Sequence, residues 1–270
     1  MSRRAVLLSG AGLAVAATGS LGCTATRPGA TDLEEGSFTS AARGGLETRW
    51  SISRPPGVTD ATSLPVLLVL HGKGGNHRDA FDSLHLDDVH ASLPAEHRLA
   101  IVSVDGGDTY WHHRRDGSDA GAMVTDELLP VLGGRGLDTS RLGLLGWSMG
   151  GYGALLLAAT GLRGRVAAVT TMSAALWTTP GASAPGAFDD ADDFGSHDVF
   201  ALRDVLGRVP LRLDCGVDDP FISANRAFVG GFATAPVAAF GPGGHNDTYW
   251  RSVAPTQVAF AAGHLAARVR

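Results

Sequence analysis

The chain has 270 residues, of which 22 are Lys or Arg and 27 are Asp or Glu, so its formal net charge is −5. This length allows one large domain or two small ones, and a hydrophobic fraction of 44% is enough for a substantial core. Because neither a basic patch nor an aromatic stripe between basic residues occurs, we expect no nucleic-acid partner. The alternation of strand-like and helix-like runs favours a single α/β domain.

The first 45 residues differ in character from the rest. Residues 2–8, Ser-Arg-Arg-Ala-Val-Leu-Leu, resemble a twin-arginine export signal, and an apolar stretch rich in Ala and Gly follows to Gly22. Such a stretch makes a poor membrane-spanning helix. Leu21-Gly22-Cys23 resembles the site at which bacterial lipoproteins are cleaved and acylated, but Ser20 departs from the usual pattern, so lipidation stays open. If Cys23 carries lipid, Cys215 has no disulfide partner.

These features predict three regions. Residues 1–22 are expected to form an export signal, residues 23–45 a flexible tether, and residues 46–270 the folded domain. We therefore expect an exported protein, extracellular or at the cell surface, with a possible membrane tether through Cys23.

Apolar runs predict the strands, and the run at 64–70 suits a central strand that is buried on both faces. The predicted strands are 46–54, 64–70, 99–104, 142–145, 165–171, 209–215 and 235–240. Helices are predicted at 120–132, after residue 150, at 221–232 and at 248–268, the last interrupted or restarted at Pro255. The stretch 173–196 is an irregular insertion, too short for a helical cap domain, so we expect an open site.

The segment Gly146-Trp147-Ser148-Met149-Gly150 is the centre of the predicted site. It has the G-x-S-x-G spacing of a nucleophile elbow, in which a serine lies on a sharp turn between a strand and a helix. In a chain with 37 glycines the spacing alone is weak, because a glycine-rich loop could match it. Apolar residues before the turn and small residues after it favour the elbow.

Two further loops complete a possible catalytic centre. His71-Gly72-Lys73 follows the strand at 64–70, where α/β-hydrolases supply an oxyanion N–H; a plain glycine turn is the alternative. We expect the backbone N–H groups of Lys73 and Met149 to form the oxyanion hole. An acid after a later strand and His245 after the last strand complete the order Ser…Asp…His of the α/β-hydrolase fold. His245 would act as general base and the Asp would orient its ring.

At this point the chain resembles the esterase D-like putative esterase family of the α/β-hydrolase superfamily. That family includes S-formylglutathione hydrolases, acetyl-xylan and feruloyl esterases and the antigen 85 mycolyltransferases. The resemblance spans residues 65–250 and rests on His71-Gly72, the elbow, Gly216-x-x-Asp219 and Gly244-His245-x-x-x-Tyr249-Trp250. It implies an α/β-hydrolase fold with a mostly parallel sheet, helices on both faces and no large cap domain. It also implies action on carboxylic esters without metal or organic cofactor.

The resemblance implies that Asp219 is the acid, because the Gly216-x-x-Asp219 spacing matches the position of the acid in the family. Asp214 lies within a predicted strand, and Pro220 restricts Asp219 to an extended backbone. Of the neighbours Asp218 and Asp219 only one can face His245, and Asp218 is the alternative.

The expected substrate is a small-molecule or carbohydrate-linked ester. The candidate substrate-binding residues are His71, Tyr110, Trp111, Trp147, Trp177 and Trp250, with the aromatic residues at 110, 111 and 177 forming a shallow wall of an acyl pocket. His112-His113 and the four acids between 189 and 193 could suggest a metal, but we interpret both as solvated loops.

The favoured function is a serine esterase that works through an acyl-enzyme. An acyltransferase that uses a sugar hydroxyl as acceptor is the alternative within the same chemistry. A non-catalytic carbohydrate- or wall-binding module is the alternative from another class, although such a module would be expected to lose the nucleophile or the base. The oligomeric state stays open.

Overall fold

The computed structural model describes residues 33–58 and 63–267, so the export signal, the possible lipidation site at Cys23 and the first ten residues of the tether lie outside the described residues. The described part folds around one eight-stranded sheet of order β1-β2-β4-β3-β5-β6-β7-β8. Antiparallel pairing joins β1 to β2 and β2 to β4, and all other neighbours are parallel. The strands are β1 (Glu34–Ser40), β2 (Leu46–Ser53), β3 (Pro65–Leu70), β4 (Ala100–Val104), β5 (Asp138–Trp147), β6 (Val166–Met172), β7 (Leu211–Asp214) and β8 (Val237–Ala239).

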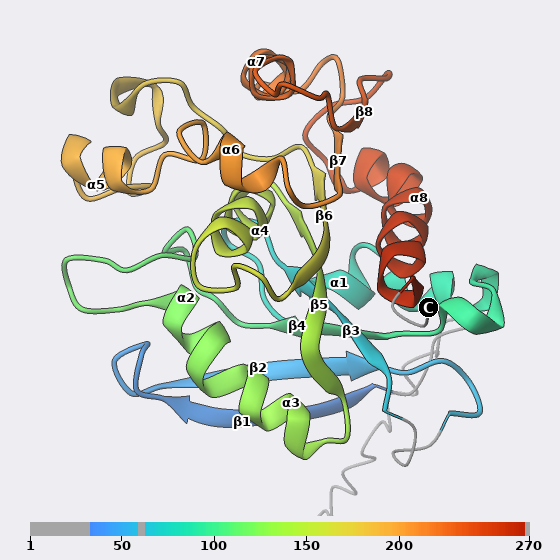
Figure 1. Cartoon of the computed structure of the whole chain (residues 1–270). Helices are drawn as coiled ribbons and strands as arrows, with labels where there is room; N and C mark the ends of the chain where they lie inside the picture. Colours follow the sequence, from blue (N-terminus) through green and yellow to red (C-terminus); the bar gives the residue numbers. More distant parts are fainter. Residues whose placement is uncertain (1–32, 59–62, 268–270) are drawn as a thin grey trace, which may run out of the picture. The chain divides into compact units, whose positions relative to one another are not determined.

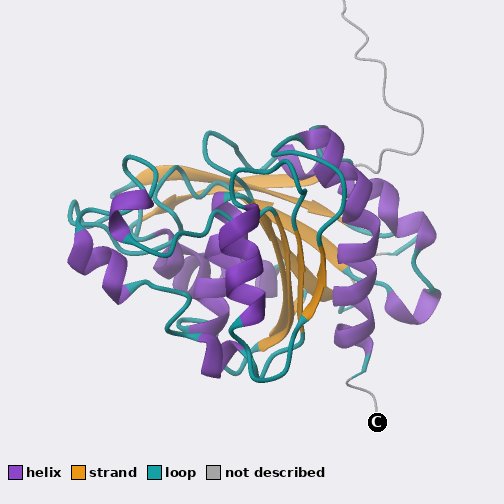
Figure 2. Ribbon diagram, turned by 90° about the horizontal axis from the view of Figure 1, so that it is seen from above, coloured by secondary structure: helices purple, strands orange, loops and turns teal. Residues whose placement is uncertain are grey.

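Helices cover both faces of the sheet, as Figures 1 and 2 show from two directions. The longer ones are α4 (Met149–Ala159) on one face and α8 (Asp247–Ala266) on the other, with α7 (Ile222–Gly230) near the end of the sheet. The shorter helices are α1 (Asp79–Asp82), η1 (Leu86–Ser92), η2 (Ala95–His97), α2 (Ala120–Ala122), the π-helical η3 (Met123–Leu128), α3 (Leu129–Gly134), η4 (Pro180–Ala182), α5 (Ala191–Ser196) and α6 (Arg203–Leu206). The helix predicted at 120–132 is thus the run from α2 to α3. The arrangement is the α/β-hydrolase fold that the sequence predicted.

The central strand β3 explains how the core is divided. Val66, Leu68 and Leu70 pack into the core cluster that contains α4, whereas Leu67 and Val69 pack into the cluster that contains α8. Because successive side chains of a strand point to opposite faces, a strand between two helical layers must be apolar at every position. This is why a continuous apolar run correctly predicted a buried strand.

The structure corrects the predicted boundary of the tether. Residues 34–40, expected to be flexible, form the edge strand β1, which pairs with β2 along its whole length. The sequence did not predict this strand, because β1 has a single large apolar residue, Phe38, and its other side chains are mostly polar. Gly36 lies directly against the ring of the buried Trp50, so the strand covers that ring.

The structure also corrects the expected break at Pro255. Helix α8 continues through it from Asp247 to Ala266. Proline removes one backbone hydrogen bond, to the carbonyl of Arg251, but both residues are exposed, so that carbonyl lies where water can reach it. Packing of Ala254, Val258 and Ala261 against the sheet holds the helix together on its other side.

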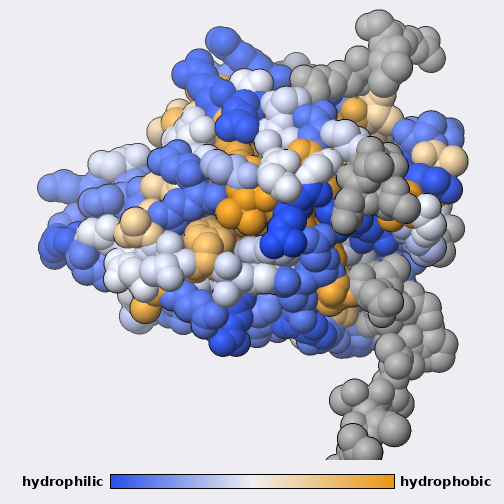
Figure 3. Space-filling model, turned by 90° about the horizontal axis from the view of Figure 1, so that it is seen from below, coloured by the Kyte–Doolittle hydropathy of each residue, from blue (hydrophilic) through white to orange (hydrophobic). Residues whose placement is uncertain are grey.

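The surface of the described part is largely hydrophilic on the face drawn in Figure 3, with hydrophobic residues in small areas. Within residues 33–58 and 63–267, none of the helices combines the length and the apolar character that crossing a membrane requires.

Candidate active site

Ser148 lies between the end of β5 and the first residue of α4, at the sharp turn that the elbow pattern predicts. Its backbone has φ 53° and ψ −121°, a conformation that costs energy for any residue with a Cβ atom. The two flanking glycines are required for close packing. A Cβ atom on Gly146 would lie 2.1 Å from the carbonyl oxygen of Gly150, and one on Gly150 would lie 1.9 Å from that of Leu70. The G-x-S-x-G spacing is therefore a steric requirement here.

Three side chains from separate loops form a hydrogen-bonded chain at one edge of the sheet. His245 Nε2 lies 2.9 Å from Ser148 Oγ, and His245 Nδ1 lies 2.9 Å from Asp219 Oδ2. Asp219 follows β7, and His245 lies between β8 and α8. When the ring proton is on Nδ1, His245 donates to Asp219 and accepts from the serine hydroxyl. The structure thus brings together the three residues that the sequence singled out.

Asp219 is held more firmly than an ordinary surface acid. It is 2% exposed, and its Oδ1 accepts the Phe221 N–H at 2.9 Å. Burial by itself raises the pKa of this carboxyl, but hydrogen bonds from His245 and Phe221 bring the pKa below its usual value. The carboxylate therefore stays ionised next to His245.

The neighbouring acids occupy other places. Asp214 is buried in β7 and pairs with Arg212 at 2.9 Å, and Asp218 is exposed. A Cβ atom on Gly216 would lie 2.1 Å from the carbonyl oxygen of Gly243, so this glycine lets the loop of Asp219 approach the loop of His245. The predicted Gly216-x-x-Asp219 spacing thus has a steric reason.

His71 does not face a substrate, contrary to expectation. It is fully buried, its Nδ1–H donates to the Gly72 carbonyl at 2.7 Å, and its Nε2 accepts the Gly106 N–H at 2.9 Å. Burial lowers the pKa of His71, which keeps the ring neutral for this pair of bonds. His71 therefore ties the loop of Lys73 to the loop after β4.

A cavity of about 330 Å³ adjoins Ser148 and His245. Its lining consists of Gly72, Lys73, Gly74, Gly75, Asp79, Ser83, Trp147, Ser148, His245, Asp247 and Trp250. Two of the expected substrate-binding residues, Trp147 and Trp250, are here, with ring centroids 6.4 Å apart. Met149 is the first residue of α4, so helix geometry leaves its N–H without a partner inside the helix.

The expected acyl-pocket wall is not formed by Tyr110 and Trp111, since both are buried in the core. Trp111 lies against Gly153 of α4, where a Cβ atom would be 2.4 Å from its ring. Trp177 is only partly buried, but it meets Phe221, whose ring lies 5.2 Å from that of His245. Phe221, which sequence reasoning missed, packs directly on the candidate base; its place two residues after Asp219 was the available signal.

The two loops interpreted as solvated are not simple loops. His112 is buried and contacts His197, while His113 is exposed. Of the acids at 189–193, Asp189 pairs with Arg114 at 2.8 Å and Asp190 accepts from backbone N–H groups at the start of α5. The partners of His112 and Asp189 are distant in the chain, so the local sequence could not show them.

Comparisons with known proteins agree with this architecture. The model of the family described as "Putative esterase" matches residues 42–258. No curated protein matches the chain. Among solved structures, a ferulic acid esterase is 21% identical with a TM-score of 0.74, covering 87% of this chain and 98% of that one.

Two further solved structures share the fold at low identity. An S-formylglutathione hydrolase from Agrobacterium tumefaciens is 18% identical with a TM-score of 0.71, covering 86% of this chain and 95% of that one. MPT51 of Mycobacterium tuberculosis is 15% identical with a TM-score of 0.69, covering 87% of this chain and 100% of that one. These likenesses establish the fold, and the family match covers most of the chain. The chain therefore belongs to this esterase family and is an esterase with the α/β-hydrolase fold.

Proposed function

We propose that the protein hydrolyses carboxylic esters through an acyl-enzyme on Ser148. The observation that supports this most directly is the position of His245, within hydrogen-bond distance of both Ser148 and Asp219. His245 takes the hydroxyl proton as Ser148 Oγ bonds to the ester carbonyl carbon, and then gives that proton to the departing alcohol. Water, activated by the same ring, attacks the acyl-enzyme and releases the acid. Asp219 keeps the proton of the resting ring on Nδ1.

The oxyanion of each tetrahedral intermediate needs hydrogen-bond donors that are already in place. We assign this role to the backbone N–H groups of Met149 and Lys73. Met149 starts helix α4, where the helix dipole also favours negative charge, and Lys73 borders the same cavity as Ser148. His71 supports the second donor by fixing the loop through Gly72 and Gly106.

The acyl group is proposed to be short. The cavity next to Ser148 has a volume of about 330 Å³, and glycines and polar side chains make up most of its lining. The only large apolar surfaces in it are the rings of Trp147 and Trp250. A long alkyl chain would find little apolar surface to bury there. We therefore expect higher kcat/KM on acetate or butyrate esters than on palmitate esters, and the reverse order would contradict this assignment.

A labelling experiment tests the acyl-enzyme. Ser148→Ala should abolish labelling by a fluorophosphonate probe and lower kcat on p-nitrophenyl acetate by roughly 10⁴-fold or more. Ser83→Ala is the matched control, because Ser83 borders the same cavity outside the hydrogen-bonded chain, and it should label normally. Labelling that persists without Ser148 would refute the proposal. A wild-type protein that neither labels nor hydrolyses any ester in a panel would favour a non-catalytic binding module.

Acyl transfer to a sugar hydroxyl is the second candidate. It is favoured by three polar side chains around the cavity, Lys73, Asp79 and Asp247, which suit an alcohol with several hydroxyl groups. Both reactions share the acyl-enzyme and differ in whether water or the sugar attacks it. Turnover of p-nitrophenyl acetate with a sugar acceptor separates them: acylated sugar indicates transfer, and free acid alone indicates hydrolysis.

We also propose that the protein is exported, on the basis of the twin arginines Arg3-Arg4 and the apolar stretch that follows. Replacing both arginines by lysine should trap the precursor in the cytoplasm of the native host. Mass spectrometry of the exported form decides whether Cys23 carries lipid. Normal export of the double-lysine variant would exclude the twin-arginine route.

A further inference from the structure

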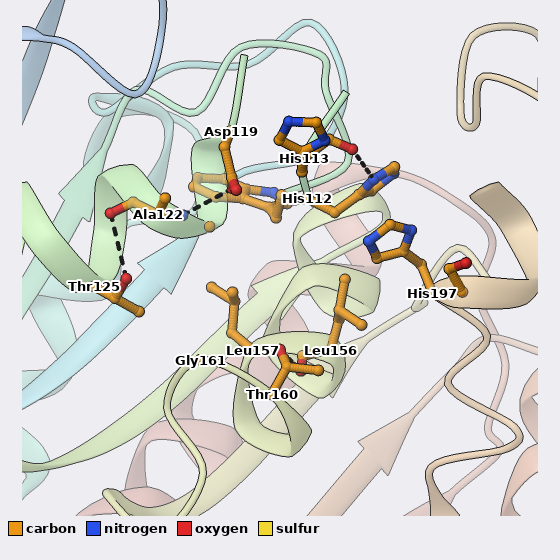
Figure 4. Close-up of a pocket in the computed structure, with 13 residues that line it drawn as sticks. His112, His113, Asp119, Ala122, Thr125, Leu156, Leu157, Thr160, Gly161 and His197 are labelled. Carbon is orange, nitrogen blue, oxygen red and sulfur yellow. Dashed lines mark hydrogen bonds between the residues drawn. The ribbon is translucent and has the colours of Figure 1, made fainter. Parts of the chain in front are cut away.

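Three possible metal-ligating side chains gather away from the candidate active site. His112 lies in the loop after β4, while Asp193 belongs to α5 and His197 follows the end of that helix. One ligand atom from each lies within 4.8 Å of the others. The two histidine rings have centroids 4.2 Å apart, and Figure 4 shows them close together beside the pocket. This pocket, of about 340 Å³, is bordered by both rings and by the exposed His113.

The hydrogen bonding of His112 cannot be satisfied by a neutral ring alone. Its Nε2 lies 3.2 Å from the carbonyl oxygen of Ala187, and its Nδ1 lies 2.9 Å from that of His113, the contact dashed in Figure 4. A neutral imidazole carries one N–H and one lone pair, so it can donate to only one of these oxygens. The other nitrogen then meets an oxygen lone pair with nothing between them. A cation at Nδ1 removes that repulsion.

We propose that His112, Asp193 and His197 bind a divalent transition-metal ion, for which Zn²⁺ is the best fit. Two imidazoles and one carboxylate are a ligand set that Zn²⁺ favours. With metal–ligand bonds near 2.1 Å, ligand atoms of a tetrahedral site lie about 3.4 Å apart. Asp193 Oδ1 lies 3.0 Å from His197 Nδ1 and 3.8 Å from His112 Nδ1, which brackets that value. His197 Nδ1 also lies 2.9 Å from the backbone carbonyl oxygen of Asp193, so binding the ion through this nitrogen replaces that hydrogen bond. A water molecule from the adjoining pocket supplies the fourth ligand.

The surroundings hold each ligand in place, as outer partners do in metal sites. The Ala187 carbonyl accepts from His112 Nε2–H, which leaves the Nδ1 lone pair for the ion. The Asp189 N–H donates to Asp193 Oδ2 at 2.8 Å, which leaves Oδ1 free to face the two rings. The Tyr152 hydroxyl donates to the His197 carbonyl at 2.8 Å.

The ion would be structural. His112 belongs to the segment between β4 and α2, and the other two ligands belong to the insertion that follows β6. Cross-linking these two segments fixes the part of the chain that carries Trp177. None of the three ligands lines the cavity at Ser148 and His245. The proposal therefore stands independently of the catalytic assignment.

Zn²⁺ binding to the full mature chain, treated with EDTA and desalted, tests this site. Isothermal titration calorimetry should show one strong site, and a hundredfold excess of Zn²⁺ over Kd should raise Tm by roughly 5–10 °C. His197→Gln and Asp193→Asn should each raise Kd by about 10²-fold or more. Both residues are partly exposed, so these variants are expected to fold, as circular dichroism will check. The control His113→Gln, in the same pocket, should bind as the wild type does.

His245 and Asp219 could also bind Zn²⁺, so this competing site is removed in a second set of variants. The series is therefore repeated with His245→Gln, in which strong binding should persist. Co²⁺ in place of Zn²⁺ should give the intense visible bands of tetrahedral coordination, and His197→Gln should lose them. The proposal is overturned if no strong site is found, if binding disappears with His245→Gln alone, or if His113→Gln weakens binding as much as His197→Gln does.

Discussion

The hydrogen bonds of Asp219 give a sharp prediction for Asp219→Asn. Oδ1 accepts from the Phe221 N–H and Oδ2 from His245 Nδ1–H, so both oxygens act as acceptors. Asparagine has one oxygen and one NH₂ group. When its oxygen keeps the bond to Phe221, its NH₂ group faces His245 Nδ1, which must then accept. The ring proton moves to Nε2, toward Ser148, and the base can no longer take the hydroxyl proton.

We expect this change to lower kcat by about 10⁴-fold, equivalent to about 5.5 kcal/mol at about 1.36 kcal/mol per tenfold. KM should change little, because Asp219 is 2% exposed and lies behind His245. Steady-state kinetics on p-nitrophenyl acetate measure both, and circular dichroism checks the fold. Asp218→Asn is the matched control: Asp218 is exposed, and its replacement should cost less than about tenfold. If Asp218→Asn proves the more damaging, or Asp219→Asn keeps a tenth of the activity, the reasoning fails.

Three further predictions follow from the elbow, the oxyanion loop and the core. Lys73→Pro, which removes a backbone N–H, should lower kcat by about 10²-fold in a folded protein, whereas Lys73→Ala should cost little; equal activities would exclude the oxyanion role. Gly150→Ala places a Cβ atom 1.9 Å from the Leu70 carbonyl oxygen and should destabilise the fold by about 3 kcal/mol or more, while Gly133→Ala, with 3.9 Å to its nearest neighbour, should be tolerated in urea unfolding. Burial lowers the pKa of His90 to about 4 in the folded protein. In the unfolded chain His90 takes up a proton as the pH falls below the ordinary histidine pKa, whereas in the folded chain it does so only near pH 4. The free energy of unfolding should therefore be largest above about pH 6.5 and smaller by about 2 kcal/mol at pH 5. His90→Gln should remove this part of the pH dependence.

The sequence by itself determined the fold class and two residues of the hydrogen-bonded chain, Ser148 and His245, while Asp219 was expected from the spacing shared with the family. The fold class and Ser148 each depend on a local requirement that is visible in the residues. A strand between two helical layers must be apolar throughout, as at 65–70, and a nucleophile elbow must have glycine on both sides of Ser148. In a mostly parallel sheet the carboxyl ends of the strands lie at one edge, so residues that follow separate strands can meet there, as Ser148, Asp219 and His245 do.

Only the tertiary structure decided which aromatic and polar side chains face the site. Trp111 and Trp250 are both aromatic residues in or near loops at the same edge, yet one is buried against Gly153 and the other borders the cavity. The difference arises from residues distant in the chain. The same holds for His112, whose partners lie about 80 positions away, and for β1, which forms because β2 offers it an edge. The local sequence determines the backbone conformation of one turn or strand. Whether a side chain is buried, or a strand finds a partner, depends on which other parts of the chain pack against it.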